Sequence, residues 1–121
     1  MTRARNVADI IKQPFTTTLG TSNYRAGVNA GNSIAAGTNF NVIIGDEAGT
    51  ALNVGDENTL IGYAAGDALL TGEANIAIGK GALGADTKGN VAVAIGVNAL
   101  AIQDFTTAAS NYNVAVGYQT G

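Results

Sequence analysis

A short pattern of polar and apolar residues recurs five times in the last two-thirds of the chain. Each copy opens with asparagine, or once with alanine, continues with three mostly apolar residues and closes with glycine. The copies span residues 41–45, 58–62, 75–79, 92–96 and 113–117. The glycines that close them are Gly45, Gly62, Gly79, Gly96 and Gly117. Their spacing is 17 residues three times and then 21 residues, and such a period is typical of a stacked, quasi-one-dimensional fold.

A second glycine in the first three units predicts a second turn. It follows the closing glycine by ten residues, at Gly55, Gly72 and Gly89. Glycine adopts positive φ without steric cost, so the two glycines of a unit indicate two turns, and the closing glycines are predicted to be structural. Two turns within 17 residues leave room for two short strands and no helix. The pattern therefore predicts an all-β fold, a parallel β-roll or solenoid.

The predicted strands are apolar on both faces. Successive side chains of a strand point to opposite faces, and the two outer positions of each copy are mostly β-branched, which suits burial. A coil of short strands encloses only one face, and the other needs a partner because soluble monomers avoid long apolar ribbons. We therefore predict a homotrimer whose chains meet through the middle residue of each strand. These middle residues are Ile43, Leu60, Ala77, Ala94 and Ala115.

The asparagines that open the strands are interpreted as structural. Stacked asparagines can hydrogen-bond to one another and to the backbone of adjacent coils as a ladder. A sugar or metal site along this ladder is the alternative. The asparagines concerned are Asn41, Asn58, Asn75 and Asn113.

The N-terminal segment predicts a different element. Residues 1–13 have helical spacing of apolar residues, and the helix would stop before Pro14 because the residue before proline avoids the helical region. A helix this short is marginal in water, so its apolar stripe needs a partner surface, and a frayed tail is the alternative. The residues predicted to bind that surface are Arg3, Arg5, Val7, Ile10 and Ile11.

Charge divides the chain in the same way. Residues 1–25 carry four basic residues and one acidic residue, a net charge of +3, and residues 26–121 carry two basic and eight acidic residues, a net charge of −6. A basic head on an acidic body indicates segments with different roles. We assign residues 1–25 as a docking segment, 26–37 as an opening or capping half-coil, and 38–121 as the repeat body.

Composition argues against an enzyme. The 121 residues include no cysteine and no histidine, which removes disulfides, thiolate metal sites and the commonest general base. The acidic pairs Asp46-Glu47 and Asp56-Glu57 follow glycines and are expected to be solvated turns, with a calcium site or a glycoside-hydrolysing pair as the alternatives. We predict no catalytic residue, cofactor or metal, and no nucleic-acid binding, because the basic segment has too few charges. No apolar run is long enough to insert into a membrane, and the N-terminus has no signal-peptide pattern, so we expect assembly in a cytoplasm.

The repeat, with an alanine three residues after its glycine, resembles the head repeats of trimeric autotransporter adhesins. Its 17-residue form is similar to repeats in bacteriophage tail fibres, and the opening Thr2–Asp9 looks like the start of such proteins. Residues 38–121 carry the resemblance, and they depart from it at Ala92 and in the longer coil of residues 97–112. The resemblance implies a left-handed parallel β-roll in which three chains pack into one body.

The resemblance also implies a virion role. The chain would be the virion-proximal part of a phage tail fibre, made in the host cytoplasm, with its N-terminus bound to the tail, baseplate or an adaptor protein. The homotrimeric shaft would lead toward a region beyond residue 121 that binds a host surface receptor, because the chain ends after a strand closure with no cap. A capsid decoration or cement protein and a cell-surface trimeric adhesin head are the alternatives, and the lack of a signal peptide disfavours the adhesin.

Overall fold

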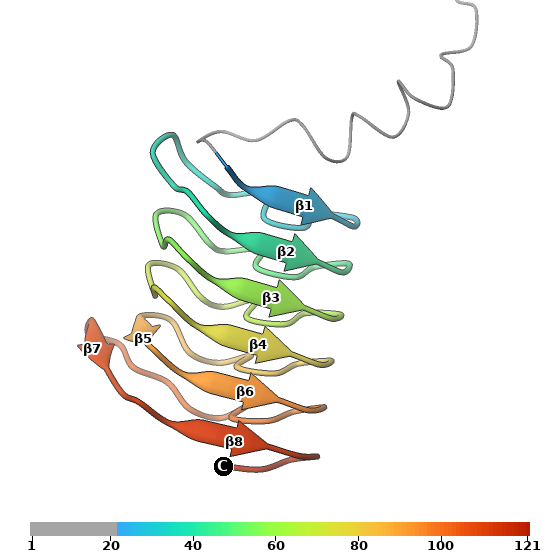
Figure 1. Cartoon of the computed structure of the whole chain (residues 1–121), viewed down its shortest axis with the longest axis vertical. Coiled ribbons are helices and arrows are strands. Elements are labelled where there is room, and N and C mark those ends of the chain that lie inside the picture. The colour runs from blue at the N-terminus through green and yellow to red at the C-terminus, as the bar shows by residue number, and fades with distance from the viewer. Residues whose placement is uncertain (1–21) are drawn as a thin grey trace, which may run out of the picture.

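A computed structural model describes residues 22–121, which form a stack of coils joined by short parallel strands (Figure 1). The strands are β1 (Tyr24–Ala26), β2 (Val42–Ile44), β3 (Thr59–Ile61), β4 (Ile76–Ile78), β5 (Gly89–Asn90), β6 (Val93–Ile95), β7 (Ala109–Ser110) and β8 (Val114–Val116). Six of them form one parallel sheet in the order β1-β2-β3-β4-β6-β8, and β5 pairs with β7 separately. The described part contains no helix, and its architecture is a β-solenoid of about five turns. The prediction of an all-β solenoid is confirmed, whereas the helix predicted for residues 1–13 lies outside the described residues.

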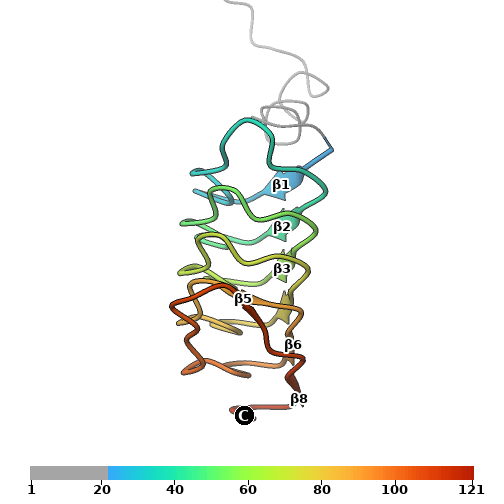
Figure 2. The same ribbon diagram turned by 90° about the vertical axis from the view of Figure 1, so that its left-hand side faces the viewer.

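The sequence repeat sets the register of the sheet. Ile43 pairs with Leu60, and Leu60 pairs with Ala77, so equivalent positions of successive copies are neighbours. Each coil therefore adds one strand directly beside the last, and the chain returns along the opposite side of the stack (Figures 1 and 2). The side chains of one slot thus form a row along the stack.

The stack begins one coil earlier than the sequence interpretation placed it. β1 pairs in register with β2, and Asn23 and Gly27 repeat the asparagine and glycine of the other copies. Arg25 concealed this copy because it puts a charged residue in the apolar middle slot; its Nη1 donates to the Gly31 carbonyl oxygen at 2.8 Å. The boundary drawn between residues 25 and 26 therefore falls inside β1, and residues 26–37 continue a coil that β1 has already begun.

The closing glycines lie where successive coils touch through their backbones. Gly45, Gly62, Gly79, Gly96 and Gly117 have φ between 125° and 130°, a region that disfavours other residues. A Cβ atom on Gly62 would lie 2.8 Å from the carbonyl carbon of Gly79, closer than van der Waals contact. The edge of the sheet can therefore stack at strand spacing only if this slot has no side chain.

Inside the coil, the side chains at two positions vary inversely in size. One is the middle of the strand, and the other is a left-handed corner four residues after the closing glycine, occupied by Gly49 and Gly66 and later by Leu83 and Leu100. A Cβ atom on Gly66 would lie 2.8 Å from Cδ2 of Leu60, so a large middle residue requires a glycine corner. Where the corner is Leu83 or Leu100, the middle slot in the same coil is alanine. The interior is thus filled at nearly constant volume, as close packing requires.

The asparagine ladder forms as predicted over the first coils. Asn41 Oδ1 accepts from the backbone N–H of Asn58 at 2.8 Å and from its Nδ2 at 3.1 Å, while Asn58 Nδ2 also donates to the Gly72 carbonyl oxygen at 2.9 Å. Asn75 repeats these contacts with Asn58 and with the Gly89 carbonyl oxygen. All three amides are fully buried, so a ligand cannot reach them. They supply hydrogen bonds to buried backbone groups that would otherwise lack partners.

The last coil replaces the ladder with a different polar cluster. Ala92 ends the ladder, and Asn113 lies outside it: it is exposed and donates from Nδ2 to Gln103 Oε1 at 2.6 Å. Gln103 Nε2 donates in turn to Asp86 Oδ2 at 2.7 Å. Asp86 is fully buried in the slot that Leu52 and Leu69 fill in earlier coils.

Asp86 also anchors the start of the four-residue-longer coil. Its Oδ1 accepts from the backbone N–H groups of Gly89, at 2.8 Å, and Phe105, at 3.1 Å. After this anchor the chain leaves the regular path and forms β7 beside β5, to one side of the main sheet (Figure 1). The 21-residue coil therefore directly follows the 17-residue coil in which aspartate replaces leucine in this interior slot.

We predict that Gly62→Ala will destabilise the stack by more than Gly37→Ala. Both glycines have positive φ, 129° and 95°, and strained backbone of this kind costs about 1–3 kcal/mol. Only Gly62 has backbone atoms within 3 Å of the added Cβ, whereas Gly37 has nothing within 4 Å. Denaturant unfolding measures both losses, and equal losses would show that coil-to-coil contact at Gly62 contributes nothing beyond strain.

Candidate interaction surface

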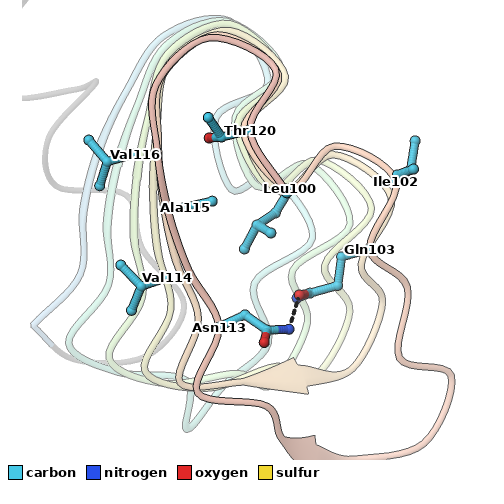
Figure 3. A pocket seen from close by; sticks show the side chains of 9 residues that line it. Leu100, Ile102, Gln103, Asn113, Val114, Ala115, Val116 and Thr120 are labelled. Atoms are coloured by element: carbon cyan, nitrogen blue, oxygen red, sulfur yellow. Dashed lines mark hydrogen bonds between the residues drawn. The ribbon is translucent and has the colours of Figure 1, made fainter.

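The middle residues of the strands point into the coil. Ile43, Leu60, Ala77 and Ala94 are 0% exposed and Ala115 is 7% exposed within the single chain. Figure 3 shows the alternation in β8, where Ala115 points inward and Val114 and Val116 point away from the interior. The structure therefore corrects the prediction that places these five residues between chains, because their own coil already covers them.

The asparagine ladder decides which face points inward. The opening asparagine must turn its amide inward to meet the asparagines of the neighbouring coils, as Asn41 and Asn58 do. The middle residue lies two positions later and so points the same way, because the side-chain period of a strand is two. The spacing of asparagine and middle residue was the signal in the sequence that could have predicted this orientation.

The outer positions of the strands form the outer face of the sheet. These positions are half-buried or exposed, and from β2 to β8 they contain no charged residue. They are Val42, Ile44, Thr59, Ile61, Ile76, Ile78, Val93, Ile95, Val114 and Val116.

Two rows of residues border the outer face. The leading row immediately precedes the opening position of each copy and consists of Phe40, Glu57, Ala74, Val91 and Tyr112. The trailing row immediately follows the closing glycine and consists of Asp46, Tyr63, Lys80, Val97 and Tyr118. Residues of the leading row share left-handed φ values of 50–62°, so the chain turns this corner in the same way in every coil.

Exposed apolar side chains gather on this one side of the stack. In the described part, every exposed large apolar residue except Val54, Leu70 and Ile102 belongs to the outer face, to its two rows or to the matching positions Tyr24 and Val28 of the first coil. Strand spacings of about 4.8 Å and rises of about 3.3 Å per residue give this side a flat area of about 500 Å². The largest apolar patch on a typical soluble monomer has an area of about 300–600 Å² and is often functional, so this side is the candidate interaction surface.

The remaining candidate sites carry no reactive groups. A hollow of about 580 Å³ opens at the last coil (Figure 3). It is lined by Leu100, Ile102, Gln103, Asn113, Val114, Ala115, Val116, Thr120 and Gly121. None of these side chains is an acid or a base, so the hollow offers apolar and amide contacts but no proton-transfer group. Within residues 22–121 no cluster of histidine, cysteine, aspartate or glutamate has the geometry to hold a metal.

The acidic pairs hold neighbouring coils together. Asp46 Oδ1 accepts from the backbone N–H of Val28 at 2.9 Å, and Asp56 Oδ1 accepts from that of Asn39 at 2.7 Å. Glu47 Oε1 accepts from Asn29 Nδ2 at 2.8 Å. The expectation of purely solvated turns therefore misses these inter-coil hydrogen bonds.

The residues predicted to dock the N-terminus are Arg3, Arg5, Val7, Ile10 and Ile11, and all five lie outside the described residues. In the described part, no helix exists that could cross a membrane. Comparison of the chain with protein-family models, with curated proteins and with solved structures found no match.

Leu60→Ala is expected to cost about 2–5 kcal/mol of stability, the range for truncating a fully buried leucine. Ile61→Ala, one residue later, is expected to cost less because Ile61 is only half-buried on the outer face. Denaturant unfolding of the two variants at one protein concentration compares them directly. A larger loss for Ile61→Ala would contradict the assignment of inner and outer faces.

Asp67 predicts a dependence of stability on pH. Burial raises the pKa of the Asp67 carboxyl, backbone N–H groups of Asp67 and Ala68 oppose the rise, and Glu47 adds to it. The folded state therefore favours the protonated acid, and the stability contributed by this preference is lost as pH rises through the raised pKa. Asp67→Asn should raise the melting temperature at neutral pH and change it little well below the ordinary pKa of aspartate. An equal change at both pH values would contradict this assignment.

Proposed function

We propose that this chain is a structural module of a virion appendage, the virion-proximal part of a bacteriophage tail fibre. Three copies would join along their outer faces into a shaft, and the N-terminal segment would bind the tail, baseplate or an adaptor protein. The single observation that carries the proposal is that most of the exposed large apolar residues gather on one side of the solenoid. Its place is the virion tail, after assembly in the host cytoplasm.

The solenoid suits a role in spacing and attachment. Every coil is bonded to the next through the sheet, so the stack is held along its whole length. The asparagine ladder and acidic side chains add hydrogen bonds between the first coils. Length can be added by copying a coil, because each coil contacts only its neighbours. A rod of this kind can hold two other parts of an assembly apart without any chemistry of its own.

The outer face supports self-association. A single chain leaves Tyr63, Tyr112 and Tyr118 more than half exposed beside a row of β-branched side chains. Packing three such faces around one axis would remove them from water, at about 25 cal/mol for each Å² of apolar surface buried. This arrangement keeps the trimer of the sequence-based prediction but replaces the middle residues with the outer positions and the bordering rows.

The winding of the coils supports the left-handed roll that the resemblance implies. In Figure 1 the strands run from left to right in front, the chain returns behind them, and successive coils descend toward the C-terminus. A chain that winds in this sense as it recedes from its N-terminal end follows a left-handed path.

Docking is proposed to belong to residues 1–13. Their apolar side chains, Val7, Ile10 and Ile11, would each contribute up to about 1.5–3 kcal/mol if fully buried on a partner. Arg3 and Arg5 would contribute mainly to orientation and association rate. The host-recognition region would belong to another part of the fibre.

Particle labelling tests the proposed function. Immunogold electron microscopy of virions that contain the full protein should place this chain at the tail, where removal of residues 1–13 should abolish incorporation. The deleted protein should still fold and associate, because the described coils begin after this segment. Label on the capsid shell would instead identify a decoration protein, label on a cell surface would identify an adhesin, and normal incorporation of the deleted protein would place docking elsewhere.

A further inference from the structure

The longer coil carries one extra residue directly before its strand in the main sheet. β5 pairs with β7 through Asn90 and Ser110, and β6 pairs with β8 through Val93 and Val114. Two residues lie between the paired positions in the earlier coil, whereas three lie between them in the longer coil. An unequal pairing of this kind is a β-bulge, and a bulge re-aims a side chain.

The extra residue is Asn111. Val91 and Tyr112 both have left-handed φ, of 60° and 50°, and both precede the opening position of a copy, so these two residues correspond to each other. Asn111 has no counterpart in the earlier coil, and its backbone N–H donates to the Asn90 carbonyl oxygen at 3.0 Å. Its side chain is therefore not bound to the pattern of the repeat.

The Asn111 amide lies where the repeat would place the amide of a ladder asparagine. In a regular coil, a Cβ atom on Gly72 would lie 3.0 Å from Nδ2 of Asn75, three residues further along. One coil later, the residue three positions after Gly89 is Ala92, which has no amide. A Cβ atom on Gly89 would instead lie 2.7 Å from Asn111 Nδ2.

The oxygen of this amide also makes the hydrogen bond of a ladder asparagine. In the regular ladder, Asn58 Oδ1 accepts from the backbone N–H of Asn75 at 3.0 Å. Ala92 has no such oxygen to offer to Asn113. Asn111 Oδ1 accepts from the Asn113 backbone N–H at 3.1 Å, so it supplies the acceptor that the ladder lacks at this level.

The nitrogen of the same amide lies beside a buried carboxylate. Asn111 Nδ2 is buried and has no hydrogen-bond partner within residues 22–121, whereas buried donors in proteins nearly always have one. Asp86 is fully buried, and its Oδ2 would lie 2.2 Å from the same Cβ atom on Gly89. Asp86 Oδ2 accepts from Gln103 Nε2, and a carboxylate oxygen can accept a second hydrogen bond. The two atoms surround one point, so one water molecule with hydrogen bonds of about 2.8 Å can contact both.

We infer that Asn111 takes the place of the asparagine that the repeat lacks at position 92 and, together with Asp86, binds one buried water molecule. The water accepts a hydrogen bond from Asn111 Nδ2 and donates one to Asp86 Oδ2. A metal cation would suit the carboxylate but not the amide N–H groups, so water is the ligand that matches both. The longer coil thereby rejoins the stack with its buried polar groups paired, and this inference does not depend on the proposed virion role.

Competition for the place of the ladder amide tests the role of Asn111. In the full chain, Ala92→Asn should lower the urea midpoint of unfolding, because two amides would compete for one place. Ala92→Asn combined with Asn111→Ala should return the midpoint to the wild-type value or above, because the regular ladder is then complete. Ser110→Ala, at the exposed neighbouring residue, is the matched control and should leave the effect of Ala92→Asn unchanged. Additive effects of Ala92→Asn and Asn111→Ala, whatever their signs, would overturn the inference.

Cross-relaxation between water and protein, measured by NMR on the full isotope-labelled wild-type chain, tests the water molecule. The side-chain amide of Asn111 should show a cross-peak to a long-lived water molecule. The side-chain amide of Asn58 is the internal control and should show none, because it donates to Asn41 Oδ1 and to the Gly72 carbonyl oxygen. An Asn111 amide without this cross-peak would overturn the water site.

Discussion

The close stacking of successive coils is the constraint on which the rest of this structure depends. Neighbouring strands must lie at hydrogen-bonding distance along the whole sheet, so every slot of the coil has to repeat at that spacing without a clash. Gly62 shows the consequence, since a single added carbon there would meet the backbone of Gly79 at 2.8 Å. The buried asparagines are the second consequence, because each amide bonds to the next coil as well as to its own.

A coil this narrow has a small interior. One middle residue and one corner residue share its width, and Leu60 with Gly66 or Ala77 with Leu83 are alternative ways to fill it. Small domains bury a small fraction of their surface, so a stack built on such coils gains stability from any surface it can share. The outer face offers additional apolar surface that an association could bury, beyond the small amount that the interior of the coil buries.

The structure departs from the repeat beside a buried polar residue, Asp86. Asp86 replaces a leucine in an interior slot, and a buried carboxylate requires hydrogen-bond donors. The backbone N–H of Phe105 and the Gln103 amide satisfy it, and the chain leaves the 17-residue path at this point. The buried carboxylate is thus satisfied by donors from its own coil and from the longer coil that follows it.

The sequence by itself determined the class of fold, the coil length and the register, because glycine and asparagine recur at one spacing and stacked slots must match. It also predicted the asparagine ladder, which requires only the identity of one residue per coil. Tertiary structure decided which face of each strand points inward. Both faces are apolar, and the amide contacts of Asn41 and Asn58 are what distinguishes the inner face from the outer one. It likewise decided that the coil containing Arg25 belongs to the stack, because the pairing of β1 with β2 does not depend on an apolar middle residue. The same amide contacts determine which residues form the outer face, because a shift of one position along a strand exchanges its two faces.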